Sequence, residues 1–107
     1  MILSGIPSCD TCRKAKKALE AAGHLVTLRD VRAEPLGGDE IAEFVGLFGE
    51  RIVNRASTTW RGLTEAECAA PVPDLLAAHP TLMKRPVIRG AQLTLGWDKA
   101  TQTAQGL

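Results

Sequence analysis

The sequence predicts an α/β domain built around a small mixed sheet, and three features of the chain lead to that prediction. Residues 1–28 show a strand-like, a helix-like and a second strand-like pattern in turn. A helical region interrupted by prolines follows, and the chain then returns to two short strand-like runs before its last helix. A chain of 107 residues can bury a single hydrophobic core, so we expect one domain spanning residues 1–107.

The first three elements are predicted to form a βαβ unit. Residues 1–6 have the apolar character of a short buried strand, and residues 25–28 have that of a second one. Between them lies an amphipathic helix that Gly23 can cap at its C-terminal end. Its apolar positions recur at helical spacing and are Ala15, Ala18, Leu19 and Ala22. Two strands joined through a helix are expected to pair in parallel, with a right-handed crossover.

The middle of the chain is predicted to be helical but broken. Asp39 can cap a helix whose apolar residues fall at i, i+3, i+4 and i+7, namely Ile41, Phe44, Val45 and Phe48. The remainder is interrupted by Pro71, Pro73 and Pro80, so we expect several short helices there. One should open at Thr64, because Glu67 three residues later completes a capping box, and another should cover residues 74–78.

The chain is predicted to end with a β-hairpin and a short helix. Residues 87–89 and 92–95 are joined by a connection of hairpin length, so these strands should be antiparallel. Asp98 is placed to begin a last helix that frays into a polar tail. This order of elements is typical of a thioredoxin-like domain with a helical insert. We place the core at about residues 1–35 and 84–107 and the insert at about 36–83.

A pair of cysteines at the start of the first helix is the main candidate for chemistry. Cys9 lies where unpaired backbone N–H groups and the positive end of the helix dipole converge, which favours its thiolate. Four cations within two turns should add to this effect, and they are Arg13, Lys14, Lys16 and Lys17. Cys12 is one turn further on, where it could resolve a mixed disulfide.

Two other interpretations of the cysteine pair stay open, a zinc half-site and a pair of small core residues. Zinc needs four ligands, usually from a second CxxC or a spaced histidine pair. The chain offers only Cys68, His24 and His79 besides, and they do not have such a spacing. We therefore expect redox chemistry and no bound metal.

Composition argues against several classes of function. The net charge of +1 and the four aromatic residues do not suit nucleic-acid binding. No apolar run reaches the ~20 residues of a membrane span, and the N-terminus does not resemble a secretory leader. Three cysteines, an odd number, fit a reducing compartment, so we expect a cytoplasmic protein.

Two segments far from the cysteines in sequence contain further candidates. The guanidinium of Arg55 could hold an oxyanion through paired hydrogen bonds, although most arginines are solvated surface groups. Pro86 follows Arg85 at the entry to the first hairpin strand, where an X-Pro bond can be cis, although a trans proline that starts an edge strand is more frequent. Cys68, His24 and His79 are interpreted as packing or surface groups.

Three separated segments resemble the ArsC/Spx family across essentially the whole chain. They are Gly5 to Ala15 (GIPSCDTCRKA), Asn54-Arg55 with Thr58 to Arg61 (TTWR), and His79 to Ile88 (HPTLMKRPVI). The resemblance implies a thioredoxin-like fold with an inserted helical subdomain. It also implies that Cys9 is the catalytic cysteine, that Arg55 and Arg85 hold an oxyanion, and that Pro86 is a cis-proline. Arg13, beside the cysteines, completes the expected substrate-binding set.

Two departures from the family pattern bear on the substrate. Arsenate reductases of the family have a third arginine after the terminal hairpin, where this chain has Leu95-Gly96-Trp97. That ending, with the TTWR segment, is more similar to the YffB-like branch, for which glutathione-dependent thiol reduction has been proposed. The second cysteine, Cys12, makes a CxxC pair that is similar instead to that of the Spx regulators, which sense oxidation through such a pair and bind RNA polymerase.

The resulting hypothesis is a monomeric, cytoplasmic, thiol-dependent reductase in which Cys9 attacks the substrate and Cys12 then closes a disulfide with Cys9. Its substrate would be an oxyanion or a glutathione mixed disulfide. Glutathione or a glutaredoxin would restore the dithiol, with no bound cofactor and no nucleic-acid or membrane partner. The alternatives are a redox-sensing regulator that binds RNA polymerase and a family member that survives as a small binding module.

Overall fold

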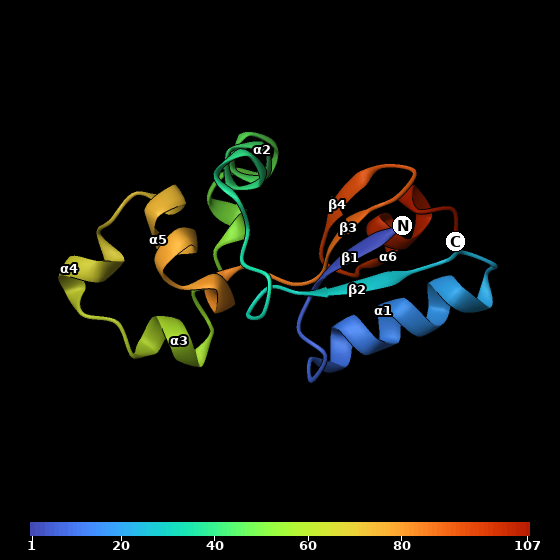
Figure 1. The fold of residues 1–107 in the computed structure, drawn as a ribbon, viewed down its shortest axis with the longest axis horizontal. Coiled ribbons are helices and arrows are strands. Elements are labelled where there is room, and N and C mark those ends of the chain that lie inside the picture. Colours follow the sequence, from blue (N-terminus) through green and yellow to red (C-terminus); the bar gives the residue numbers. More distant parts are fainter. The chain divides into compact units, whose positions relative to one another are not determined.

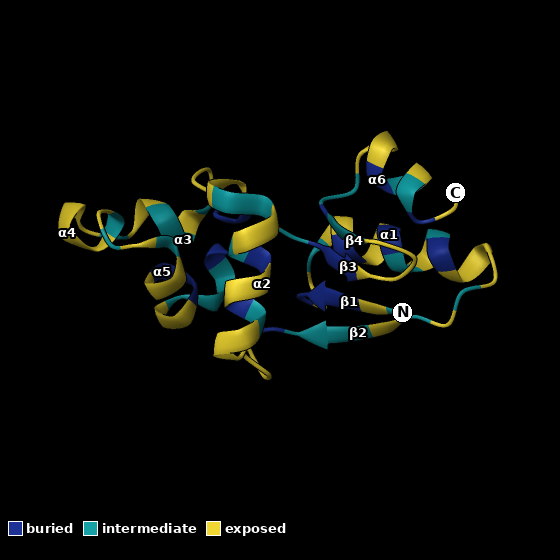
Figure 2. Ribbon diagram, turned by 90° about the horizontal axis from the view of Figure 1, so that it is seen from above, coloured by how far each residue is buried: buried dark blue, intermediate teal, exposed yellow.

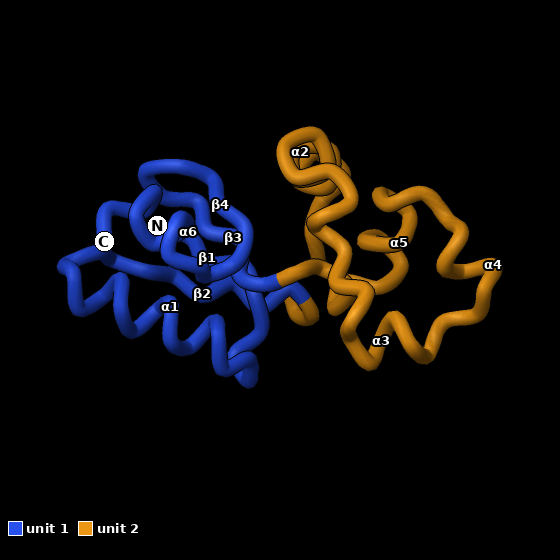
Figure 3. The backbone as a smooth tube through the Cα atoms, turned by 180° about the vertical axis from the view of Figure 1, so that it is seen from behind, with its two compact units in different colours: residues 1–31, 85–107 blue, residues 32–84 orange.

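The computed structural model describes residues 1–107, and the chain is divided between two units (Figure 3). Unit 1 consists of residues 1–31 and 85–107, and unit 2 consists of residues 32–84. The chain therefore leaves unit 1 once, builds unit 2, and returns to complete the first unit.

Unit 1 is a four-stranded mixed sheet with two helices, and its strand order is β2-β1-β3-β4 (Figure 1). The strands are β1 (Ile2–Gly5), β2 (Thr27–Asp30), β3 (Val87–Arg89) and β4 (Leu93–Leu95). β1 pairs in parallel with β2 and antiparallel with β3, and β3 pairs antiparallel with β4. The predicted parallel βαβ unit and antiparallel hairpin are thus confirmed.

The second strand starts two residues later than the sequence pattern predicts. Residues 25–28 were the expected strand, but β2 begins at Thr27, which pairs with Ile2 of β1. Leu25 is 90% exposed and stays outside the sheet. The apolar residue at this position therefore misleads the prediction, because pairing with β1 and not local hydrophobicity decides where the strand begins.

Helix α1 (Asp10–Ala21) covers the sheet with a stripe of small and apolar residues. Cys12, Ala15 and Leu19 are all fully buried and pack with Leu3 of β1 and Ile88 of β3. In Figure 2 the buried residues lie along this side of the helix and in the central strands, whereas the outer face of α1 is exposed. Spacing at i, i+3 and i+7 explains why these residues share one face.

Helix α6 (Lys99–Ala104) closes unit 1 and is followed by a residue that the sequence does not predict to be buried. Asp98 caps the helix as expected, since its carboxylate accepts a hydrogen bond from the N–H of Thr101 at 2.8 Å. Gln105 is fully buried, and its Nε2 donates to the oxygen atoms of Gln92 and Thr94 at 2.9 and 2.8 Å. The expected fraying tail is wrong at this position, because Gln105 ties the end of the helix to the hairpin.

Unit 2 is helical, as the broken pattern in the middle of the chain predicts. Its elements are α2 (Gly38–Phe48), η1 (Gly49–Ile52), α3 (Thr58–Arg61), α4 (Glu65–Cys68), α5 (Val72–Ala78) and η2 (Pro80–Leu82). The capping box of Thr64 and Glu67 is present at the start of α4. Helix α2 begins one residue before Asp39 instead of after it, and the carboxylate of Glu40 accepts the N–H of Gly37 there.

Candidate functional site

Cys9 lies at the junction of β1 and α1, where the chain turns from strand to helix. Its N–H donates to the carbonyl of Ile6 at 3.0 Å, and its carbonyl accepts the N–H of Arg13 as the first helical hydrogen bond. The side chain is half-buried and packs against the cluster that contains Cys12 and Ile88. Cys9 is therefore the residue immediately before the helix, at the end where the first backbone N–H groups have no partner within the helix.

The thiol of Cys9 has a lowered pKa, although two influences oppose each other. Burial raises the pKa of Cys9, because it disfavours the charged thiolate. Hydrogen bonds from the backbone N–H and the thiol of Cys12, together with the hydrogen bond and positive charge of Arg85, lower it by more. The net result is that Cys9 ionises more readily than an ordinary cysteine.

Cys12 shows the opposite behaviour. Its pKa is raised to about 11, mainly by burial and also by the neighbouring Cys9 thiolate, which repels a second negative charge and accepts the proton of Cys12 in a hydrogen bond. The N–H of Ile6 and the charge of Arg85 act against this rise. At neutral pH the structure thus pairs an ionisable Cys9 with a Cys12 that keeps its proton and donates it as a hydrogen bond.

Gly5, the last residue of β1, makes room for this pair of sulfur atoms. A Cβ atom placed on Gly5 would lie 2.4 Å from the sulfur of Cys12, which is closer than Cβ atoms approach other atoms in proteins. Gly5 belongs to the first of the three motif segments, but the motif alone does not indicate this role. The signal that could have revealed it is a glycine in a strand that runs directly into a cysteine pair, since strand glycines often mark a close approach.

Arg85 and Pro86 reach the cysteines through strand pairing. Ser4 pairs with Val87, so the residues before β3 lie beside the end of β1 and the turn that leads to Cys9. The Arg85–Pro86 peptide bond is cis, as the family resemblance implies, and Pro86 is fully buried. The structure therefore brings Cys9, Cys12, Arg85 and Pro86 together within unit 1.

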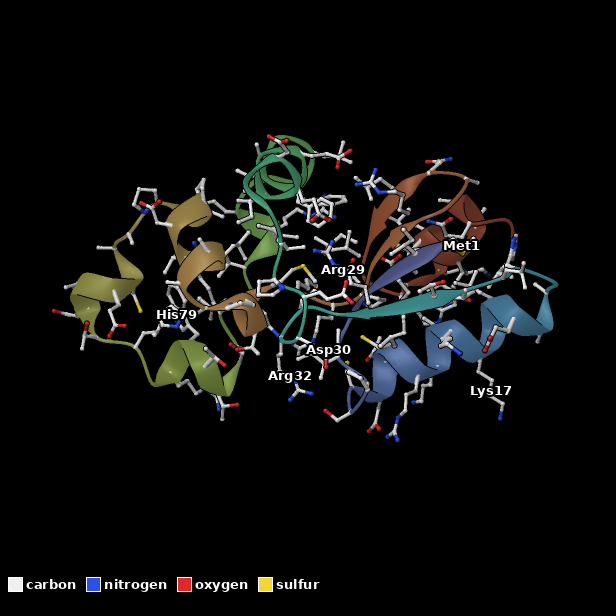
Figure 4. All side chains as sticks on the ribbon, viewed as in Figure 1. Met1, Lys17, Arg29, Asp30, Arg32 and His79 are labelled. Atoms are coloured by element: carbon white, nitrogen blue, oxygen red, sulfur yellow. The ribbon has the colours of Figure 1, made fainter.

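Two basic residues of α1 pair with acidic side chains of the same helix. Arg13 donates to the carboxylate of Asp10, and Lys16 pairs with Glu20 at 3.1 Å. Lys17 points away from the sheet (Figure 4). Burial, Cys12 and Arg85 are the main influences on the pKa of Cys9, so a contribution from the cations of α1 stays a prediction. A role for Arg13 in binding substrate stays a prediction.

Arg55 lies in unit 2, where it contacts two neighbours. Its guanidinium carbon lies 5.4 Å from the ring centre of Trp60, and its Nη2 lies 3.4 Å from a carboxylate oxygen of Glu50. Both ion-pair side chains are largely exposed, so the pair is weak. Its assignment as an oxyanion ligand stays a prediction.

The other reactive side chains do not assemble a second centre of chemistry. No group of three or more His, Cys, Asp or Glu side chains is arranged to hold a metal ion. All three cysteines are free thiols, and Cys68 is half-buried in α4. His79 lies 3.5 Å from Glu67. No helix combines the length and the apolar character needed to cross a membrane.

Comparison with known proteins identifies relatives that match most of the chain. The ArsC family profile matches residues 4–104. The global transcriptional regulator Spx of Bacillus subtilis is 32% identical over 88 residues, which is 77% of this chain and 67% of Spx. An arsenate reductase (ArsC) related protein from Brucella melitensis has a solved structure that is 35% identical, with a TM-score of 0.72 over 96% of this chain and 91% of that one.

A further solved structure confirms the predicted fold. The protein described as YFFB (PA3664) superposes with a TM-score of 0.88 at 29% identity, and the match covers 97% of this chain and 96% of that one. The α/β architecture with a thioredoxin-like core and a helical insert is thus shared with these proteins. From the family profile and the relatives together, this chain belongs to the ArsC family.

Proposed function

We propose that this protein is a cytoplasmic thiol-dependent reductase in which Cys9 is the nucleophile. The observation that carries the proposal is the lowered pKa of Cys9 beside a Cys12 that stays protonated. A thiolate at neutral pH is what attack on a disulfide or an oxyanion requires. The relationship to arsenate reductase-related proteins supports the same class of chemistry.

With a glutathione mixed disulfide as substrate, the reaction would run in two exchanges. The Cys9 thiolate attacks the glutathionyl sulfur, so that a Cys9–glutathione disulfide forms, the original S–S bond breaks, and the substrate thiolate leaves and takes up a proton. Free glutathione then attacks the glutathionyl sulfur, which releases the Cys9 thiolate and yields oxidised glutathione. Two electrons pass from glutathione to the substrate.

Cys12 offers a second route for the step that releases glutathione from Cys9. Once Cys9 is part of a mixed disulfide its negative charge is gone, and with it one of the causes that raise the pKa of Cys12. The Cys12 thiolate could then attack the Cys9 sulfur, forming the Cys9–Cys12 disulfide and releasing glutathione. A glutaredoxin or two glutathione thiols would reduce that disulfide again.

With an oxyanion such as arsenate, Cys9 would attack the central atom and a hydroxyl group would leave as water. A second thiol then attacks the Cys9 sulfur, and the bonding electron pair stays on arsenic, which is thereby reduced by two electrons. Arg85 lies beside Cys9 and would stabilise the charge of the anion. Arg55 and Arg13 are the further arginines that we assign to this step, and Pro86 would shape the edge against which the substrate docks.

The thiol pKa of Cys9 tests the proposal directly. Alkylation rates would be measured against pH in a Cys68→Ser protein, with Cys9→Ser as the blank. We expect half-maximal reactivity clearly below about 8.5, the value of an unperturbed cysteine. A midpoint at or above that value would refute the proposed nucleophile. Turnover with arsenate and with a glutathionylated peptide would then separate the two substrates.

A second function is favoured by the similarity to Spx. The Cys9–Cys12 pair matches the position of the redox pair expected in such regulators, and Spx of Bacillus subtilis is 32% identical to this chain. A regulator would bind RNA polymerase in one redox state and show no turnover. A pull-down with oxidised and reduced protein distinguishes these functions, because a reductase should bind RNA polymerase in neither state.

A further inference from the structure

A surface pocket in unit 2 gathers three cations around one carboxylate. Its volume is about 410 Å³, which is within the range of small-molecule sites. Four charged residues are among those that line it, Glu50, Arg51, Arg55 and Lys84, and their formal charges sum to +2. Asn54 adds a neutral polar group, and all of these residues belong to unit 2.

The backbone beneath the pocket is held by pairing of two short segments. Val53 and Met83 form an antiparallel bridge, and hydrogen bonds flank it from Asn54 N–H to the Leu82 carbonyl at 2.8 Å and from Lys84 N–H to the Ile52 carbonyl at 2.7 Å. Glu50 and Arg51 precede this bridge in η1. Charged residues from positions 50–55 and from position 84 are therefore fixed at one place by main-chain contacts.

The contacts already present within the pocket are weak enough to be replaced by a ligand. Arg55 and Glu50 are separated by 3.4 Å and their side chains are 48% and 78% exposed. An ion pair of that length and exposure contributes little. Trp60 lies under the Arg55 guanidinium and restrains it without occupying its hydrogen-bonding edge. The ion pair of Arg55 and Glu50 can therefore break, so that both groups bind a ligand, with little loss of free energy.

We propose that this pocket binds a small amino dicarboxylate, a molecule with two carboxylates and one ammonium group. The three cations would pair with the carboxylates, and Glu50 would pair with the ammonium group, so that the ligand mirrors the charges of the pocket. Free glutamate has this pattern, and so does the peptide glutathione. If glutathione is the ligand, the inference rests on the proposed function and identifies where its reductant binds.

Binding can be measured without any thiol chemistry. A Cys9→Ser, Trp97→Phe protein has Trp60 as its one tryptophan, and Trp60 contacts Arg55, so its fluorescence should report occupancy of the pocket. The probes are glutamate, S-methylglutathione, succinate and inorganic phosphate, with calorimetry as a second measurement. Because Cys9 is absent, failure of the reductase hypothesis would not affect the result.

The proposal predicts a specific order of affinities. Glutamate and S-methylglutathione should change Trp60 fluorescence saturably and bind more tightly than succinate, which lacks the ammonium group. Tighter binding of S-methylglutathione than of glutamate would assign the pocket to the thiol peptide, and equal binding would assign it to the amino acid. Glu50→Gln should weaken the binding of glutamate and strengthen the binding of succinate. A loss of folding cannot produce such a reversal.

Removing the cations supplies the matched comparison. Arg51→Ala combined with Lys84→Ala should lower the affinity for glutamate about tenfold. Lys17→Ala combined with Lys99→Ala removes the same charge from unit 1 and should leave the affinity for glutamate unchanged. The absence of saturable binding by both methods would overturn the proposal. So would succinate or phosphate binding as tightly as glutamate, or an equal loss in the two double variants.

Discussion

Replacement of Gly5 by alanine should disturb the cysteine pair from a position that carries no reactive group. The new Cβ atom would lie 2.4 Å from the Cys12 sulfur, and ordinary contacts begin at 3.4 Å, so the sulfur or the strand must move by about 1 Å. Cys12 is fully buried, which leaves its sulfur little space to move into. Forced overpacking of this kind costs about 1–3 kcal/mol of unfolding free energy.

The same movement should change the chemistry of Cys9. The thiol and backbone N–H of Cys12 both hydrogen-bond to Cys9 and lower its pKa. A displaced Cys12 should weaken these bonds, so the pKa of Cys9 should rise towards its ordinary value. Each unit of that rise corresponds to about 1.4 kcal/mol of lost thiolate stabilisation.

Two assays on one variant test both parts of this reasoning. Urea unfolding of Gly5→Ala gives the stability change, and alkylation against pH gives the thiol pKa, both in a Cys68→Ser background. Gly46→Ala is the matched control, because Gly46 lies within α2 and no atom would come within 4 Å of its new Cβ. If Gly5→Ala matches the parent protein in both assays, the close contact between β1 and Cys12 has no energetic importance.

Three further results are expected. Cys12→Ala should raise the pKa of Cys9 more than Cys12→Ser does, because serine retains a donor; equal alkylation profiles would contradict this. The pKa of Cys12 is raised to about 11, so its contribution to stability is present below pH 9 and lost as the pH rises towards 11. Chemical unfolding should therefore show that the free energy of unfolding falls by about 2–3 kcal/mol over that pH range in the parent protein and not in Cys12→Ser. An equal fall in both proteins would exclude ionisation of Cys12 as its cause. Gln105→Ala should lower the unfolding free energy by about 2–4 kcal/mol, because buried partners in the hairpin lose their donor, whereas exposed Thr103→Ala should have almost no effect.

Local patterns were sufficient to predict the elements that depend on near neighbours. The helix α1, the antiparallel β3–β4 hairpin and the capping box at Thr64 were recognised correctly, because each is encoded within a few adjacent residues. The cysteine pair was also found at a helix start for this reason. The second hairpin strand begins at Leu93, one residue later than predicted. The family resemblance extended the prediction to the fold as a whole.

Pairing between distant segments decided the features that were missed. The start of β2 depends on its register with β1, and the burial of Gln105 depends on the hairpin that it contacts. Both are set by residues far away in the sequence, so no local pattern contains them.

The sequence by itself determined that two thiols stand one turn apart at the beginning of a helix, since four consecutive residues are enough for that. Only the tertiary structure decided which of them ionises. The β1–β3 pairing brings Arg85 to Cys9, and the packing of α1 on Gly5 buries Cys12. The direction of each pKa shift follows from charge, hydrogen bonding and burial, and these are supplied by segments that meet only when the chain is folded.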